Sequence, residues 1–170
     1  KAFTSSDIER LGALTDLAEK GINSHVKAKE LARANASLTR LNRLFEQAEA
    51  AAQIGSWRVD LQTNELHWSD QAFAIHGVPV GTPLTVEKAV EFYDPEDRGL
   101  VEDVLDRVLE TGEPLTFEAT IRRKDGERRR IRAMGERIDV DNVPESLAGV
   151  FLDCTEEHLQ TVALQRAATR

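Results

Sequence analysis

The sequence predicts an α+β domain in which a five-stranded antiparallel sheet carries helices on one face. Two short strand patterns come first: residues 56–61 alternate apolar and polar side chains, and residues 65–68 return after a turn. Three longer strand patterns follow over residues 114–122, 128–140 and 146–153. Helical patterns separate the two groups of strands. This order is typical of one sheet packed against helices.

Size and charge limit the class of protein. The chain has 170 residues, a net charge of −8 and 41% hydrophobic side chains, which suits a globular domain with appendages. The acidic balance makes nucleic acid a poor partner. No apolar run approaches the roughly 20 residues that cross a bilayer, and the single cysteine, Cys154, excludes an internal disulfide. We therefore expect a cytoplasmic location. The sequence begins and ends inside helical patterns, so we expect a piece of a longer protein.

A first helix is predicted over residues 1–22. Thr4 to Asp7 form an N-cap signal, and an apolar face follows at helical spacing. Gly21 is predicted to end or weaken this helix. The pattern resembles the last helix of a GAF domain. A free amphipathic helix is the alternative.

A second helix is predicted over residues 23–53 as a linker before the domain. Its apolar residues alternate between spacings of three and four: Leu31, Ala34, Leu38, Leu41, Phe45, Ala48 and Ala52. A long helix with one narrow apolar stripe has nothing of its own to bury that stripe against. We therefore expect a parallel homodimeric coiled coil with Leu31, Leu38, Leu41 and Phe45 in its seam. The alternative is that the stripe folds back on the domain.

Capping signals place two short helices after the first strand pair. Ser69 is predicted to cap a helix over residues 70–76, which Gly77 ends. A loop rich in Pro and Gly follows, and then a helix over residues 85–92.

A longer helix is predicted over residues 94–110. Asp94 is expected to cap it, because Pro95 and two acidic residues follow at the positive end of the helix dipole. Gly112 is expected to stop it. Further on, Gly126 is expected to take a positive φ in a tight hairpin turn, and residues 141–145 are expected to make the next reversal.

Residues 54–154 resemble a PAS domain. The motifs that carry the resemblance occur in order: Ile54-Gly55-Ser56-Trp57, Trp68-Ser69, Tyr93-Asp94-Pro95-Glu96-Asp97-Arg98, Arg123-Lys124-Asp125-Gly126-Glu127, Gly149, and Asp153-Cys154-Thr155-Glu156. The chain is similar to the branch with a Trp in the first strand and an Asp-Ile-Thr-like end. It departs from that branch at Asp94, where many members have His, and at Arg130-Ile131, where an aromatic residue is common.

The end of the last strand is the first candidate site. Asp153 is predicted to cap a C-terminal helix over residues 155–170, with Glu156 completing a capping box three residues later. A plain helix start is one interpretation. The resemblance to PAS domains implies more: Asp153 and Thr155 would bond across this hinge and relay a change in the sheet to the outgoing helix.

The interior of the sheet is the second candidate site, because PAS domains hold haem, flavin or small metabolites there. The residues expected to line it are Trp57, Trp68, Phe73, Phe92, Leu105, Phe117, Ile131 and Phe151. A LOV-type flavin site would need Cys in an Asn-Cys-Arg context, and a haem site would need His on the long helix. The sequence has neither. The ligand therefore stays unknown: an unidentified small molecule and a core filled by side chains are both open.

No metal or catalytic site is expected. His67 and His76 flank the first short helix, and Cys154 with His158 would make half a metal site, but no second pair completes it. The basic residues of 122–132 lack interleaved aromatics, so solvated faces and ion pairs between subunits are preferred to nucleic-acid binding, with the acids Glu102, Asp103, Asp106 and Glu110 offsetting them. Phosphate loops and nucleophile motifs are missing from the sequence.

The sequence therefore predicts a sensory input module, not an enzyme, that works as a dimer between signalling helices. The tail over residues 164–170 resembles the run ahead of a GGDEF cyclase domain and would also suit a histidine kinase. A ligand-free dimerisation and spacer module is the main alternative. An autonomous small-molecule enzyme is the third.

Overall fold

The computed structural model describes residues 4–168, which form two compact units divided between Phe45 and Glu46. Helix α1 runs without a break from Ser5 to Ala52. It passes through Gly21, so the prediction that this glycine ends the helix is wrong. One glycine in a helix costs only about 1 kcal/mol relative to Ala, which a long run of good helix formers tolerates. The resemblance to a GAF helix stays a prediction.

The predicted seam of α1 is exposed to solvent in the single chain. Leu31, Leu38, Leu41 and Phe45 each leave more than half of their surface accessible. The apolar residues of the first turns are exposed as well, at Ile8, Leu11, Leu14 and Leu17. The coiled coil stays a prediction, since these side chains have no cover within the unit that contains them.

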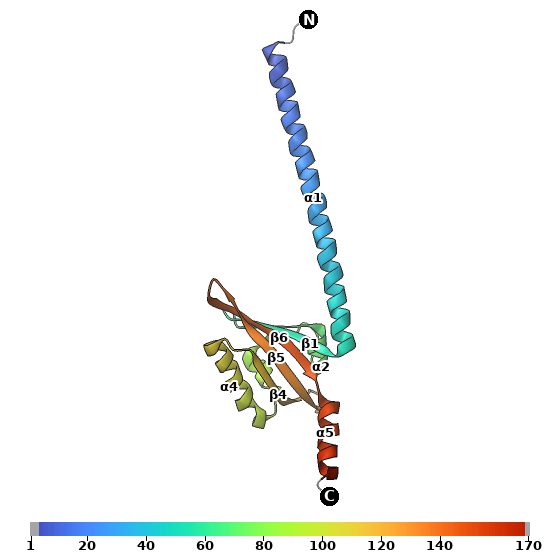
Figure 1. Cartoon of the computed structure of the whole chain (residues 1–170), viewed down its shortest axis with the longest axis vertical. Coiled ribbons are helices and arrows are strands. Elements are labelled where there is room, and N and C mark those ends of the chain that lie inside the picture. Colours follow the sequence, from blue (N-terminus) through green and yellow to red (C-terminus); the bar gives the residue numbers. More distant parts are fainter. Residues whose placement is uncertain (1–3, 169–170) are drawn as a thin grey trace. The chain divides into compact units, whose positions relative to one another are not determined.

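The second unit contains one antiparallel sheet of six strands in the order β3-β2-β1-β6-β5-β4 (Figure 1). The strands are β1 (Ile54–Asp60), β2 (Glu65–Trp68), β3 (Leu84–Thr85), β4 (Leu115–Arg122), β5 (Arg128–Val140) and β6 (Val143–Asp153). The predicted α+β architecture, an antiparallel sheet with helices, is confirmed, with one strand more than expected. The extra strand, β3, has only two residues, which pair with Glu65 and Leu66. A strand of that length is too short to show an alternating pattern.

The hairpin between β5 and β6 is tighter than predicted. Asp141 and Asn142 both take a positive φ, and Val140 pairs directly with Val143. Two consecutive residues with positive φ are the mark of a type I′ turn, whose twist matches that of the strands. Strand β6 therefore begins at Val143 instead of residue 146.

Three helices pack on the sheet within this unit: α2 (Asp70–His76), α3 (Val86–Val90) and α4 (Pro95–Thr111). The caps of α2 are as predicted: Ser69 accepts a hydrogen bond from the amide of Ala72, and Gly77 closes the helix with a φ of 67°. Thr85 caps α3 by accepting from the amide of Lys88. Helix α2 packs against β1 and α4 against β4, so α4 lies along the sheet beside its edge strand (Figure 1).

Asp94 corrects the prediction for the start of α4. It stands at the N-cap position, yet its side chain makes no capping hydrogen bond. Its carboxylate is buried and instead pairs with the guanidinium groups of Arg122 and Arg128. Two charged partners offer a buried carboxylate more than one backbone amide does. At its other end, α4 stops at Gly112 with a φ of 73°, as predicted.

The core is built around a tryptophan that lies over two glycines. Gly135 and Gly149 are paired across β5 and β6. A Cβ atom added at either glycine would run into the ring of Trp57. The ring is thereby buried at the centre of the sheet, where it stacks at a tilt on Phe151 with 5.9 Å between ring centroids. The missing side chains of these glycines thus make the room that the indole needs.

Two one-residue joints connect the sheet to helices. Gln53 alone separates α1 from β1, and its φ of 54° is left-handed. Cys154 alone separates β6 from the C-terminal helix α5 (Thr155–Ala168). Since β1 and β6 are neighbours and Ile54 pairs with Leu152, both joints lie at the same end of one strand pair.

Candidate functional site

The joint between β6 and α5 is held by a cluster of short hydrogen bonds. One carboxylate oxygen of Asp153 accepts from both the amide (3.0 Å) and the hydroxyl (2.6 Å) of Thr155. The other accepts from Nη1 of Arg129 at 2.7 Å. Asp153 and Thr155, predicted to form the relay, are therefore brought together by the fold, and Arg129 joins them from β5.

The same joint is tied to the backbone of β5. The amide of Arg130 donates to the hydroxyl oxygen of Thr155 at 2.9 Å. The amide of Cys154 donates to the carbonyl of Arg130, also at 2.9 Å. These bonds join Cys154 and the first residue of α5 to the neighbouring strand, so the start of the helix is fixed to β5 as well as to β6.

Asp153 is a charged member of this cluster. Burial opposes ionisation of its carboxyl, but the hydrogen bonds from Thr155 and Arg129 outweigh burial and lower its pKa below the ordinary value. The same hydrogen bond to Asp153 raises the pKa of the Arg129 guanidinium. Both groups are therefore charged at neutral pH, and they form an ion pair of 2.7 Å.

Glu156 lies outside the cluster. It is exposed, and it makes no hydrogen bond or ion pair with residues 4–168. The expected capping box is therefore not formed. Asp153 bonds to the amide two residues on, as in an Asx-turn, instead of to the amide three residues on that a capping box requires.

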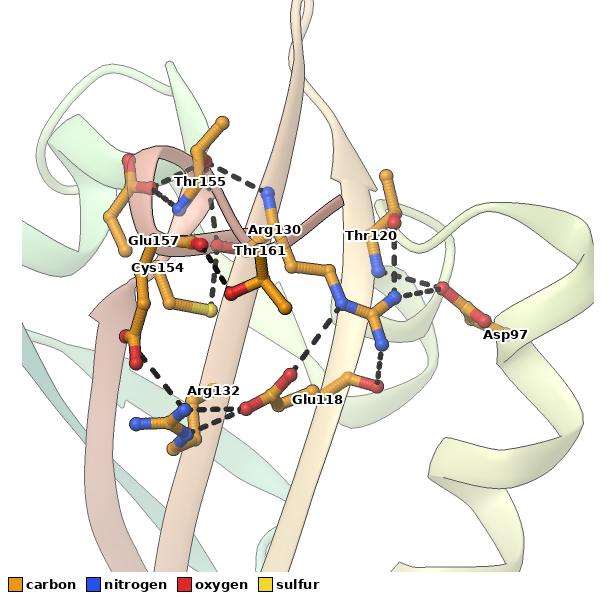
Figure 2. A network of polar contacts seen from close by, with 10 residues as sticks. Asp97, Glu118, Thr120, Arg130, Arg132, Cys154, Thr155, Glu157 and Thr161 are labelled. Carbon is orange, nitrogen blue, oxygen red and sulfur yellow. Dashed lines mark hydrogen bonds and ion pairs between the residues drawn. The ribbon is translucent and has the colours of Figure 1, made fainter. Parts of the chain in front are cut away.

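A chain of alternating charges runs from the joint across β5 and β4 (Figure 2). Arg132 and Glu118 are directly opposite each other in the ladder and form an ion pair of 2.6 Å. Arg132 also approaches Glu157 of α5, at 3.9 Å. Cross-strand pairs of opposite charge stabilise a sheet by roughly 0.2–1 kcal/mol each. These ion pairs therefore stabilise the sheet beside α5.

Arg130 continues the chain to α4 (Figure 2). Its guanidinium donates to the carbonyl of Glu118 and the hydroxyl of Thr120, and it lies 3.5 Å from a carboxylate oxygen of Asp97. That oxygen of Asp97 also accepts from the amide of Thr120 at 2.7 Å. The first turn of α4 is thus connected to the joint through the side chain and backbone of one residue, Arg130.

The arginines of the basic run form ion pairs within the chain. Their partners lie within β4, at the end of β6, in the turn between β4 and β5, and at helix starts: Glu118, Asp153, Asp125, Glu127, Asp94, Asp97 and Glu157. The acids predicted to offset it are not among them, because within residues 4–168 Glu102, Asp103, Asp106 and Glu110 form no ion pair. These four acids stand farther along α4 than its first turn, so within the described residues they do not offset the run through ion pairs.

The interior of the sheet holds an apolar cavity of about 50 Å³. Of the residues predicted to line it, Trp57, Trp68, Leu105, Phe117 and Phe151 do so. Phe73 and Phe92 pack on the ring of Trp68 instead, and Ile131 is fully buried elsewhere in the core. The indole nitrogens of Trp57 and Trp68 are buried without a hydrogen-bond partner in the part of the chain described here.

The cavity does not fit a flavin or a haem. Its volume is well below the roughly 150 Å³ of an apolar cavity that holds one benzene molecule. Neither Cys nor His lines it. A volume of about 50 Å³ fits one or two water molecules, at roughly 30 Å³ each. The side chains of the core thus fill most of the space that larger ligands would need.

The histidines take different places. His67 is exposed and lies 3.9 Å from a carboxylate oxygen of Glu65. His76 is fully buried, stacked on Trp68 at 4.1 Å between ring centroids, with Nδ1 2.8 Å from the carbonyl of Ala72. Burial, assisted by the charge of Arg123, lowers the pKa of His76 to about 4 even though the Ala72 bond opposes this. The ring is therefore neutral at physiological pH.

Metal binding has no support among residues 4–168, which contain no cluster of three or more potential ligands. The half-site of Cys154 and His158 has a protonated thiol, because burial and the nearby carboxylate of Glu118 raise the pKa of Cys154. Metals bind the thiolate. None of the helices in these residues is long and apolar enough to span a membrane.

Sequence reasoning missed Arg129, Arg130 and His76. The two arginines lie 24 or more residues before the joint, so only the pairing of β5 with β6 brings them there. A local signal existed for His76: it stands three residues after Phe73 and four after Ala72, on the buried face of α2.

Comparison with known proteins agrees with this fold. The PAS fold family matches residues 65–151, and the chain belongs to that family. It is 31% identical over 117 residues to the sensor protein FixL of Bradyrhizobium diazoefficiens, covering 68% of this chain and 23% of that protein. It is 32% identical over 110 residues to the probable diguanylate cyclase DgcE of Escherichia coli K12, covering 64% and 10%. The chain thus spans less than a quarter of either relative.

A solved structure shows the same fold. The sensory box histidine kinase/response regulator from Burkholderia thailandensis E264 superposes with a TM-score of 0.63 at 23% identity, covering 74% of this chain and 95% of that one. The chain is therefore a PAS sensory domain, a module that is not itself catalytic.

Proposed function

We propose that this chain is the input module of a multidomain signalling protein and relays a signal through paired helices to a C-terminal output domain. The observation that carries the proposal is the joint of Asp153, Thr155 and Arg129, which ties the first turn of α5 to β5 and β6. The relatives named as a sensor and a cyclase favour a diguanylate cyclase or a histidine kinase as the output.

The proposed mechanism is mechanical. A ligand, or a movement arriving through α1, shifts the sheet, and the cluster at Asp153 passes this shift to α5. The exposed seam of α1 supports a homodimer, because four large apolar side chains in heptad spacing are energetically costly to leave in water. We place the module in the cytoplasm, where its one cysteine, Cys154, would stay reduced.

Asp153→Ala is expected to change the activity of the output domain several-fold in a full-length protein. The substitution removes the acceptor of three hydrogen bonds and leaves Arg129 without its partner at the joint. The domain should stay folded, because the cluster lies at the end of the sheet and a lost cap costs about 1 kcal/mol. Cyclase or kinase turnover, with circular dichroism of the same sample, measures both effects.

Glu156→Ala is the matched comparison: Glu156 lies three residues after Asp153, in the first turn of α5. It removes a charge near the positive end of α5, worth about 0.3–1 kcal/mol, and no contact among the described residues. We expect a smaller change in output. Unaltered regulation in Asp153→Ala would remove the relay proposal.

Leu38→Glu with Leu41→Glu is expected to convert a dimer into a monomer. Two carboxylates in the seam would face their own copies across the interface, where like charges repel. Sedimentation equilibrium should give twice the chain mass of 19.0 kDa for the parent chain and the single mass for the variant. Ala36→Glu adds a charge on the face of α1 opposite the seam and should leave the dimer intact. A parent chain that stays at the single mass at micromolar concentration would contradict the proposal.

The second candidate function is a spacer that dimerises without a ligand. The small cavity of about 50 Å³ favours it, since core side chains occupy most of the interior. Native mass spectrometry of purified protein separates the two. A retained metabolite supports sensing by this domain, and a bare chain with unchanged regulation supports the spacer.

A further inference from the structure

A surface hollow of about 370 Å³ lies between α3, the start of α4 and the end of β4, and none of the joint residues Arg129, Asp153 and Thr155 lines it. Its volume is in the range of roughly 300–1,000 Å³ that small-molecule sites occupy. Five cationic side chains line it: Lys88, Arg98, Arg122, Arg123 and Lys124. Two acids line it with them, Glu91 and Asp94. This excess of positive charge stands out in a chain whose net charge is −8.

Part of this positive charge is already neutralised. Arg122, together with Arg128 from outside the hollow, pairs with the buried carboxylate of Asp94. Arg123 lies 3.5 Å from Asp125 and 3.7 Å from Glu127. These ion pairs fix the wall of the hollow and cancel the charge of Asp94.

Three cations remain without a carboxylate partner among residues 4–168: Lys88, Arg98 and Lys124. Arg98 is held in place, because its guanidinium donates to the carbonyls of Tyr93 (3.0 Å) and Glu91 (2.9 Å). Lys88 stands on α3 and Lys124 follows β4, so the three charges come from three separate elements around one hollow.

We propose that this hollow binds a small polyphosphate anion. Three unpaired cations around a concave surface attract a compact, multiply charged group more than a single carboxylate. A lysine acts as a point charge on phosphate oxygens, and an arginine fixed by carbonyls offers the rest of its fork at a small cost in side-chain entropy. Phe92 also lines the hollow and gives a nucleotide base an apolar surface.

The test uses the whole chain of 170 residues and inorganic triphosphate as the probe, followed by calorimetry at low salt and by amide NMR. Saturable binding with shifts confined to residues 85–98 and 120–125 is expected. Lys88→Ala and Lys124→Ala should each weaken binding about threefold or more, and the double variant about tenfold or more. Both lysines are exposed, so the melting temperature should stay unchanged.

Lys29→Ala is the matched control, because it removes one exposed lysine from α1. It should bind like the parent chain. Equal weakening in Lys29→Ala and Lys88→Ala, or unweakened binding in the double variant, would overturn the proposal, as would an absence of saturation at millimolar triphosphate.

Two further probes define the ligand class. Citrate carries three carboxylates, and we expect it to bind at least tenfold more weakly than triphosphate; equal affinity would overturn the phosphate assignment. Adenosine triphosphate distinguishes a free nucleotide from an inorganic anion. Tighter binding of the nucleotide, lost in Phe92→Ala, supports a nucleotide, and equal binding supports an inorganic polyphosphate.

Discussion

Gly149→Ala is expected to destabilise the PAS domain by about 3 kcal/mol or more and to lower its melting temperature by about 10 °C or more. An added Cβ would meet the carbonyl oxygen of Met134, the Cα of Gly135 and the ring of Trp57, all inside the 3.0 Å below which such atoms essentially never approach. Two of these neighbours are backbone atoms, which a rotamer change cannot move aside. Urea unfolding followed by tryptophan fluorescence measures the free energy of unfolding.

Gly99→Ala is the matched control for this loss. Gly99 is exposed on α4, and an added Cβ there has nothing within 4 Å. Because Ala favours helix by about 1 kcal/mol over Gly, this variant should be as stable as the parent or slightly more so. If Gly149→Ala unfolds at the same urea concentration as Gly99→Ala, the packing of Trp57 on the glycine pair is not as described.

His76 is expected to make the domain lose about 3 kcal/mol of stability between pH 7 and pH 4. Its pKa is about 4 in the folded chain and 6.5 when solvated, so in this window the unfolded chain binds the extra proton. Protonation of the unfolded chain therefore draws the equilibrium toward unfolding as the pH falls below 6.5. The stabilisation is complete above that value, where both states hold a neutral ring.

His76→Phe isolates this contribution. A phenyl ring keeps the stacking on Trp68 and removes the buried Nε2, which has no hydrogen-bond partner among residues 4–168. The free energy of unfolding should then vary less between pH 6.5 and 4 than in the parent chain. His67→Phe removes an exposed histidine and should keep the parent's slope. Identical slopes for both variants and the parent would show that His76 titrates normally.

Acidic residues such as Asp153 change the stability of the domain at lower pH than His76 does. Its pKa is below the ordinary value in the folded chain, so its contribution is present above that ordinary value and is lost as the pH falls toward the folded pKa. The difference between the parent and His76→Phe removes this shared contribution.

The parts of the fold that could be predicted rest on local rules. Gly77, Gly112 and Gly126 take the positive φ that their turns require, and Ser69 caps α2 as its position indicates. The strands of the sheet could also be predicted locally, because the side chains of a strand point to its two faces in turn and so alternate between apolar and polar in the sequence. Strand β3 was not predicted, because two residues are too few to show an alternation of apolar and polar side chains.

The candidate site could be predicted only in part, because its partners come from distant strands. Asp94 satisfies every local rule for a cap, yet arginines 28 and 34 residues away hold its carboxylate. Asp153 and Thr155 are two residues apart, and their mutual bond follows from a short-range pattern. Arg129 depends on the register of β5 on β6, which the hydrophobic pattern alone fixes only to within two residues.

The one-residue joint at Gln53 makes the direction of the α1 seam depend on the number of residues in the helix. Because Gln53 is the whole connection between α1 and β1, a residue inserted in α1 above the joint turns the preceding helix by about 100° relative to the sheet. An insertion of seven residues restores the seam to nearly its former direction, and an insertion of two points it nearly the opposite way. If the proposed relay holds, we expect length changes in α1 to alter output with the periodicity of a helix, because they change the angle of the seam as well as its distance from the sheet.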